Sequence, residues 1–71
     1  MHNLPALSDL RLFCAVLRRG SLAAVAIELG ASPSFVSKRI AVLEGVLGAR
    51  LLHRTTRRLS ATEEGEAVRR W

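Results

Sequence analysis

Three glycines divide most of the chain into stretches whose apolar residues have the spacing of an α-helix. Gly20, Gly30 and Gly48 each follow such a stretch, at the position where a helix commonly ends in a left-handed glycine. Ser32 and Pro33 directly precede the third stretch, as an N-cap hydroxyl and a proline that suits the first helical turn. The sequence therefore predicts three short helices, at about 5–19, 22–29 and 33–47.

The apolar spacing within these stretches predicts which faces form the core. In the first helix Leu12 and Val16 form a second apolar stripe beside the main one. The predicted core face of the first helix consists of Leu7, Leu10, Phe13, Cys14 and Leu17. The second helix adds Leu22, Val25, Ala26 and Leu29, and the third adds Val36, Ile40, Leu43 and Leu47.

The opposite face of the third helix carries small residues and a single cation. At about 100° per residue, this face comprises Ser34, Ser37, Lys38, Ala41 and Gly45. Glycine costs about 1 kcal/mol of helix propensity relative to alanine, so Gly45 is a weak point of the helix.

With 71 residues, 49% of them apolar, the chain suits one small domain with an aliphatic core. A single cysteine excludes an internal disulfide, and Cys14 with His2 and His53 provides too few ligands for a tetrahedral zinc site. No apolar run is long enough to span a membrane and no secretory signal is present, so we expect a cytoplasmic domain. Without a catalytic triad, carboxylate pair or phosphate-binding loop, we expect neither an enzyme nor a cofactor.

The net charge of +5 is confined to one part of the chain. Residues 32–58 contain six cations against Glu44 alone, which gives the whole +5, whereas the other residues contain five charges of each sign. Within this stretch Arg50 could pair with Glu44 or bind a phosphate. Such a run is either a solvated basic face or a site for a polyanion, and the charge alone favours neither.

Beyond residue 48 the helical spacing ends. Residues 50–60 contain two short apolar segments around a basic tip and predict a β-hairpin wing, although β-branched residues occur only at the tip. Thr62 can cap a fourth helix with an acidic first turn, in which Glu66 can pair with Arg70 at i+4.

The second and third predicted helices have the spacing of a helix-turn-helix. Ala26 is small enough for the helices to cross closely, Gly30 makes the turn and Val36 packs the next helix. This geometry places the N-terminal part of the later helix in a major groove. A basic wing can reach phosphates or a narrow minor groove. The side chains presented to DNA are then Ser34, Ser37, Lys38, Arg57 and Arg58.

Four segments carry motifs of one known protein family. Residues 20–26 (GSLAAVA) resemble a G-S-F-x-x-A-A motif, and residues 37–44 (SKRIAVLE) look like S-R-Q-I-x-x-L-E. Residues 47–57 (LGARLLHRTTR) resemble an L-G-x-x-L-F-x-R-T-x-R wing, and residues 62–65 (TEEG) are similar to the T-x-x-G that opens a linker helix. With these motifs the chain resembles LysR-type transcriptional regulators over nearly its whole length, about 4–71.

The resemblance implies a mainly α, winged helix-turn-helix fold with a three-helix core, a short β-hairpin wing and the start of a linker helix. The implied domains are a DNA-binding domain at 1–61 and a truncated dimerisation helix at 62–71, which is a candidate partner for the second apolar stripe of the first helix. The implied function is sequence-specific binding of double-stranded DNA for bacterial transcriptional regulation, with the recognition helix (about 33–47) in the major groove and the wing (about 50–60) at the minor groove or phosphates. Family members act as a homodimer or tetramer and continue into a co-inducer-binding domain, which this chain does not contain.

The resemblance also implies which side chains contact DNA. Ser34, Ser37 and Lys38 fall where the family contacts bases or nearby phosphates, and Arg57 falls at its minor-groove arginine. The complete set expected at DNA is Ser32, Pro33, Ser34, Phe35, Ser37, Lys38, Arg39, Arg54, Thr55, Thr56, Arg57 and Arg58.

The sequence departs from the family pattern at three of these positions. Pro33 stands where many relatives carry glutamine, so a bidentate adenine contact is excluded there. Phe35 replaces a small residue and either touches a thymine methyl or, as we favour, is buried under the preceding helix. Lys38 replaces the commoner arginine, and its point charge lacks the planar fork that suits guanine.

Two other functions are compatible with parts of the pattern. A small helical protein-interaction module could present the basic face to an acidic partner. Binding to RNA or single strands is less favoured, because Phe13, Phe35 and Trp71 are the only aromatic residues and do not form a stacking platform.

Overall fold

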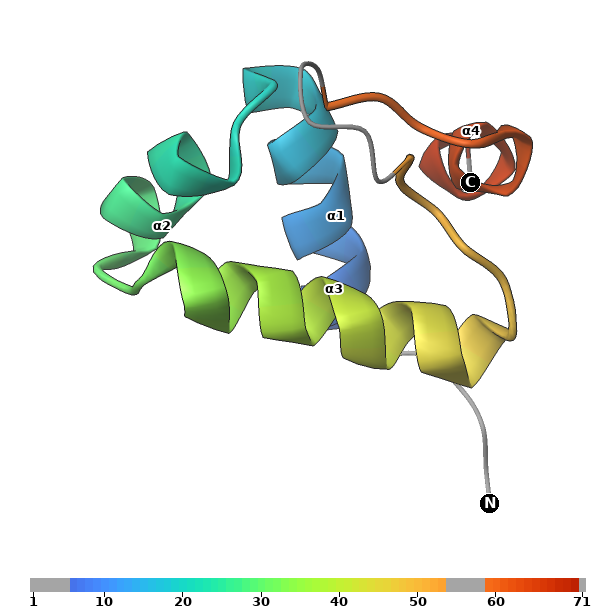
Figure 1. The fold of residues 1–71 in the computed structure, drawn as a ribbon, viewed down its shortest axis with the longest axis horizontal. Coiled ribbons are helices and arrows are strands. Elements are labelled where there is room, and N and C mark those ends of the chain that lie inside the picture. The colour runs from blue at the N-terminus through green and yellow to red at the C-terminus, as the bar shows by residue number, and fades with distance from the viewer. Residues whose placement is uncertain (1–5, 54–58, 71) are drawn as a thin grey trace.

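The computed structural model describes residues 6–53 and 59–70 and contains four helices in that part of the chain. They are α1 (Leu7–Arg19), α2 (Leu22–Leu29), α3 (Pro33–Leu47) and α4 (Glu63–Arg69). In Figure 1, α1 crosses behind α3, α2 lies beside the start of α3, and α4 lies near the end of α3. The three helices predicted before residue 48 are confirmed, and so is the fourth.

The helix ends follow from the caps that the sequence indicates. Gly20, Gly30 and Gly48 adopt φ values of 73°, 68° and 67° at the ends of α1, α2 and α3, in the left-handed region that favours glycine. At the other end of α3, the Ser32 hydroxyl accepts a hydrogen bond of 3.1 Å from the backbone N–H of Phe35. Each of these helices therefore ends at a glycine whose backbone N–H bonds a carbonyl of the last turn, and α2 and α3 begin at a serine whose hydroxyl caps the helix.

The core lies between α1, α2 and α3. Its fully buried side chains include Phe13, Val16, Val25, Val36 and Ile40. From α1, the stripe that enters this core is the second one, with Leu12 and Val16, together with Phe13. The predicted face of Leu7, Leu10, Phe13, Cys14 and Leu17 is confirmed only in part: Phe13 is fully buried and Leu10 and Leu17 pack against the core, but Leu7 is 64% exposed and Cys14 is half-buried. Both stripes are apolar, and the side on which α2 and α3 pack decides between them.

The expected wing strands are absent from the described residues. On either side of the undescribed tip, the chain forms a single antiparallel bridge between Leu52 and Ala61. Leu51 and Leu52 are both buried, so the segment lacks the alternation of a half-exposed strand. The Glu44 carboxylate accepts hydrogen bonds from the N–H groups of Leu51 and Leu52, at 2.8 and 3.2 Å, and thereby takes the Leu51 N–H that a longer ladder would pair with Thr62.

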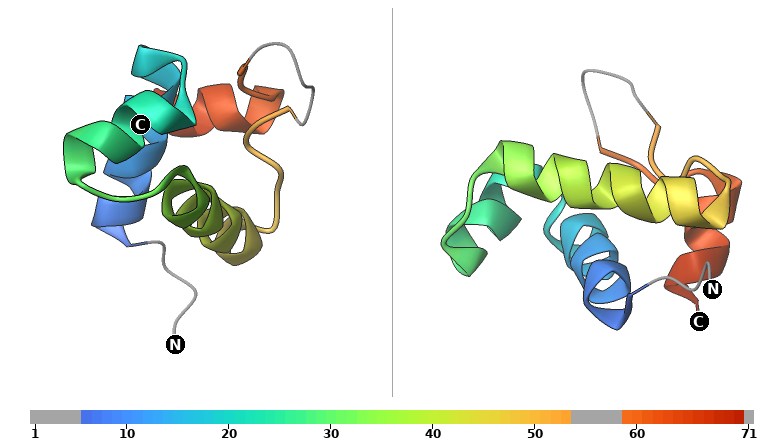
Figure 2. Two further views of the ribbon diagram at one scale, coloured as in Figure 1. Left: turned by 60° about the vertical axis from the view of Figure 1, so that its left-hand side comes forward. Right: turned by 90° about the horizontal axis from the view of Figure 1, so that it is seen from below.

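α4 begins against the backbone that follows α3. The Thr62 hydroxyl donates to the carbonyl of Arg50 at 2.5 Å and accepts from the N–H of Gly65 at 3.0 Å. Gly65 is buried so close to this segment that a Cβ atom there would overlap the carbonyl oxygen of Leu51. Figures 1 and 2 show α4 at the end of the molecule opposite to α2.

Glu66 pairs with Arg69, one residue before the predicted partner Arg70, at 2.8 Å. None of the helices in the described residues is long and apolar enough to cross a membrane.

Candidate nucleic-acid interface

The turn between α2 and α3 has the close packing that a helix-turn-helix requires. Ala26 is buried, and its carbonyl accepts a hydrogen bond of 2.8 Å from the N–H of Ala31 across the turn. Gly30 occupies the left-handed position between them, and Val36 is completely buried on the other side. The three residues on which the sequence prediction depended are thus brought together, and they fix the angle at which α3 leaves α2.

One face of α3 is open to solvent along its whole length. Ser34, Lys38, Ala41 and Gly45 are exposed, and Ser37 is half-buried at the edge of the same face. Glu44 is the one carboxylate of α3 and is buried on another side of the helix. The exposed face therefore has short side chains that permit close approach and one lysine, with no acidic residue to repel a phosphate.

The first turn of α3 presents further exposed groups beside this face. Ser32 and Pro33 are exposed at its start. Phe35 is 49% exposed, so the prediction that the preceding helix buries it is wrong. The physical reason is its position on the helix: Val36, the next residue, occupies the direction of the core, and Phe35 is turned to the flank of α3.

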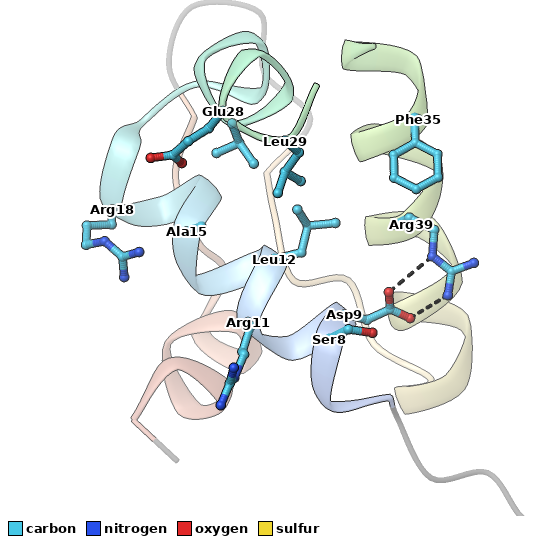
Figure 3. Close-up of a pocket in the computed structure, with 11 residues that line it drawn as sticks. Ser8, Asp9, Arg11, Leu12, Ala15, Arg18, Glu28, Leu29, Phe35 and Arg39 are labelled. Carbon is cyan, nitrogen blue, oxygen red and sulfur yellow. Dashed lines mark hydrogen bonds and ion pairs between the residues drawn. The ribbon is translucent and has the colours of Figure 1, made fainter. Parts of the chain in front are cut away.

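Arg39 lies on the same flank as Phe35 and binds α1. Its Nε and Nη2 atoms donate to the two carboxylate oxygens of Asp9 at 3.1 and 2.7 Å (Figure 3). Asp9 is 6% exposed, whereas the Arg39 side chain is 37% exposed. The hydrogen bonds from Arg39 to Asp9 and the negative charge of Asp9 raise the pKa of Arg39 above its usual range. The bidentate pair connects α3 to the start of α1.

Asp9 is a structural residue of this site that was not predicted, although its spacing on α1 indicates it. Asp9, Leu12, Phe13 and Val16 are spaced i, i+3, i+4 and i+7, so the carboxylate stands on a core stripe of α1. A charged group at a core position needs a partner, because its burial without one is costly. Arg39, a cation on the neighbouring helix α3, is that partner.

The remaining site residues cannot be placed in the same way. Arg54, Thr55, Thr56, Arg57 and Arg58 lie outside the described residues. Arg50, which precedes them, is exposed, and its carbonyl is held by Thr62. Glu44, proposed as a partner for the Arg50 side chain, holds the backbone of residues 51 and 52. The described residues contain no group of three side chains able to hold a metal ion.

Comparison with known proteins agrees with this geometry. Residues 7–66 match the family model described as bacterial regulatory helix-turn-helix protein, lysR family. Over its full length the chain is 63% identical to the transcriptional regulator DmlR of Escherichia coli K12 and covers 23% of it. It is 44% identical over 66 residues, 93% of this chain, to the probable regulator LtrA of Klebsiella pneumoniae, and covers 21% of LtrA. The chain thus spans about a fifth of the length of these relatives.

Solved structures show the same similarity. The chain matches the full-length virulence activator AphB of Vibrio cholerae, with a TM-score of 0.86 and 35% identity, over 92% of this chain and 22% of AphB. It also matches the DNA-binding domain of BenM in complex with catB site 1 DNA, with a TM-score of 0.84 and 34% identity, over 92% of this chain and 72% of that one. The helix-turn-helix, its open α3 face and these matches lead to one conclusion. The chain belongs to the LysR family of bacterial helix-turn-helix transcriptional regulators and has the DNA-binding domain of that family.

Proposed function

We propose that the open face of α3 reads bases in the major groove of double-stranded DNA, and that residues 50–60 act as a wing at the minor groove or phosphates. The observation that carries this proposal is the acid-free face formed by Ser34, Lys38, Ala41 and Gly45. A relative of similar structure, the BenM domain, is found in complex with DNA. Small side chains allow the backbone of α3 to approach the bases, and the lysine supplies a long donor.

Individual roles follow from position. Ser34, Ser37 and Lys38 contact bases or nearby phosphates, and Ser32 and Pro33 contribute at the start of the helix. Because Phe35 is half-exposed at the edge of this surface, it is a candidate for contact with a thymine methyl group. Arg39 acts from behind the surface by orienting α3 through Asp9. Arg54, Thr55, Thr56, Arg57 and Arg58 supply the wing contacts, with Arg57 in the minor groove.

For the whole protein we propose the domain division already inferred, with DNA reading at 1–61 and the start of a subunit-pairing helix at 62–71. In a dimer, or a tetramer made of dimers, two α3 helices then face half-sites about 34–36 Å apart. The regulator acts in the cytoplasm, and its response to a co-inducer resides in another domain.

The experiment that tests the DNA proposal is selection of bound duplexes from a random pool, followed by two variants. Lys38→Ala is expected to weaken binding to the selected duplex about tenfold and to relax base preference, because Lys38 lies on the reading face. Arg58→Ala is expected to weaken selected and random duplexes equally and to reduce the salt slope by about 0.9, as the loss of one phosphate contact should. Equal losses on both duplexes for both variants would contradict the division of roles.

A further inference from the structure

A groove of about 600 Å³ lies beside the reading helix, between α1, α2 and the start of α3. Figure 3 shows its two sides: Arg11 and Arg18 come from α1, Leu12 and Leu29 lie in the middle, and Phe35 comes from α3. Its volume is in the range of pockets that bind small ligands or anchor side chains of peptides. Of the residues proposed to act at DNA, only Phe35 and Arg39 line this groove; Ser34, Ser37 and Lys38 do not.

The floor of the groove is apolar and open to solvent. Leu29 is 56% exposed and Phe35 is 49% exposed, while Leu12 and Val25 form the base where the groove meets the core. Leu29 lies on α2, away from the open face of α3. An apolar surface of this kind has no counterpart in a phosphodiester backbone, and contiguous exposed apolar surface commonly marks a protein interaction site.

The charges around the groove are unbalanced. Its two carboxylates are both paired, Asp9 with Arg39 at 2.7 Å and Glu28 with Arg19 at 3.1 Å. Arg11 and Arg18 are exposed, and neither belongs to an ion pair within the described residues. Seven residues separate them, so they stand on one side of α1 about 10 Å apart along its axis. The rim therefore presents two available cations at a spacing of two helical turns.

We propose that this groove binds an acidic amphipathic helix of a partner protein. An apolar side chain of that helix lies against Leu29 and Phe35, and two carboxylates seven residues apart pair with Arg11 and Arg18. A helix in a groove is a recurring mode of peptide recognition, and the equal spacing of the two charge pairs fixes its register. Charge complementarity selects an acidic partner over a basic one.

Occupation of this groove is compatible with DNA binding. Phe35 lies about 90° around α3 from the middle of the face formed by Ser34, Lys38, Ala41 and Gly45. The groove thus opens on the flank of α3, so a partner helix there covers Phe35 but leaves the face formed by Ser34, Lys38, Ala41 and Gly45 free for DNA.

The test uses the 71-residue chain and synthetic helical peptides of about 15 residues, the length at which isolated helices become stable. The first peptide has leucines between two glutamates seven residues apart. A second has the same composition with the glutamates four apart, and a third has lysines in place of the glutamates. Binding is followed by backbone amide chemical shifts, with and without duplex DNA. We expect the first peptide to bind most tightly and to shift residues of the groove in both conditions.

Variants separate the apolar and the charged contributions. Arg11→Gln/Arg18→Gln is expected to weaken the first peptide about tenfold, as two exposed ion pairs should, with Arg70→Gln as the charge control. Leu29→Ser is expected to weaken the same peptide, whereas Ile27→Ser, at an 81% exposed position of α2 outside the groove lining, is expected to leave it unchanged. Thermal unfolding confirms that each variant is folded.

Three outcomes would overturn the proposal. The first is that the three peptides bind equally, or that the first peptide does not bind. The second is that the first peptide binds Arg11→Gln/Arg18→Gln as tightly as the unchanged chain. The third is that this variant loses affinity for duplex DNA and that the salt slope of its DNA binding is smaller by about two. The last result would assign Arg11 and Arg18 to phosphates. It leaves the assignment of bases to α3 untouched, since that depends on Lys38.

Discussion

The two ends of α3 are held to the rest of the domain by different interactions. In its first half, α3 is held by the buried side chains of Val36 and Ile40 and by the ion pair of Arg39 with Asp9, whose arginine is partly exposed. At its end, Glu44 holds the backbone of residues 51 and 52, which is in turn covered by the buried Gly65 of α4. Toward its C-terminal end, α3 is held by a buried carboxylate that binds backbone N–H groups, whereas its first half is held by packing against α1 and α2 and by a partly exposed ion pair. We therefore expect stability to depend mainly on the end of α3 and DNA binding mainly on its start.

Gly65→Ala is expected to lower the free energy of unfolding more than any other substitution considered. A Cβ atom would overlap the Leu51 carbonyl oxygen, and since that neighbour is backbone it cannot turn away. We expect the free energy of unfolding to fall by about 3 kcal/mol, at the upper end for overpacking. Urea denaturation measures the change. A loss below that of the other variants would show that α4 can slide away from the segment after α3.

Glu44→Gln weakens the same end without adding volume. The carboxylate accepts two backbone hydrogen bonds, and the neutral amide accepts them less strongly. We expect a loss of about 2 kcal/mol, because hydrogen bonds to charged groups are stronger than neutral ones. Urea denaturation at neutral pH checks this value, and Glu63→Gln, at an exposed position of α4, serves as the control.

Gly45→Ala tests the open face between the two ends. A Cβ atom at this position meets nothing within 4 Å, so the substitution gains helix propensity without strain. We expect the free energy of unfolding to rise by about 1 kcal/mol. If α3 lies in the major groove of DNA as far as Gly45, the added methyl group also lowers the affinity for the selected duplex. Thermal unfolding and duplex titration measure the two effects, and higher affinity would place Gly45 outside the interface.

Arg39→Lys has the smallest expected effect on stability and sharpens the role of the first half of α3. Lysine keeps the charge beside Asp9 but cannot form the bidentate pair. We expect a smaller loss of stability than for Glu44→Gln, together with weaker binding of the selected duplex, because the start of α3 is less well oriented. Comparison of melting temperature with duplex affinity tests this; unchanged affinity would show that the core alone orients α3.

The helices could be predicted from the sequence because their ends are local. Ser32, Gly30 and Gly48 satisfy backbone groups within a few residues, so neither the cap nor the C-terminal turn depends on the rest of the fold. The helix-turn-helix was predictable for the same reason. Its contacts span only the stretch from Ala26 to Val36.

The errors concern contacts between segments that are distant in the sequence. Both apolar stripes of α1 suit a core face by spacing, and the structure buries Leu12 and Val16 of the second stripe more deeply than Leu7 and Cys14 of the first. The pairing of Asp9 with the distant Arg39, which marks the buried side of α1, is a contact that the spacing within α1 does not show. The wing strands were predicted from two short apolar segments on either side of a basic tip. The N–H groups of Leu51 and Leu52 donate instead to the carboxylate of Glu44. Strand propensity does not predict such bonds, because it takes no account of side chains from another element.

The attachment of the backbone after α3 to Glu44 has a consequence for how such a regulator acquires new operators. Glu44 joins α3 to the backbone of residues 51 and 52, so a change at that joint is expected to displace α3 and the proposed wing together. Side chains at the open face of α3, by contrast, can be exchanged one at a time on an unchanged frame. Mutational paths to a new binding site are therefore expected to accumulate at Ser34, Ser37 and Lys38, while Glu44 and Gly65 stay the same.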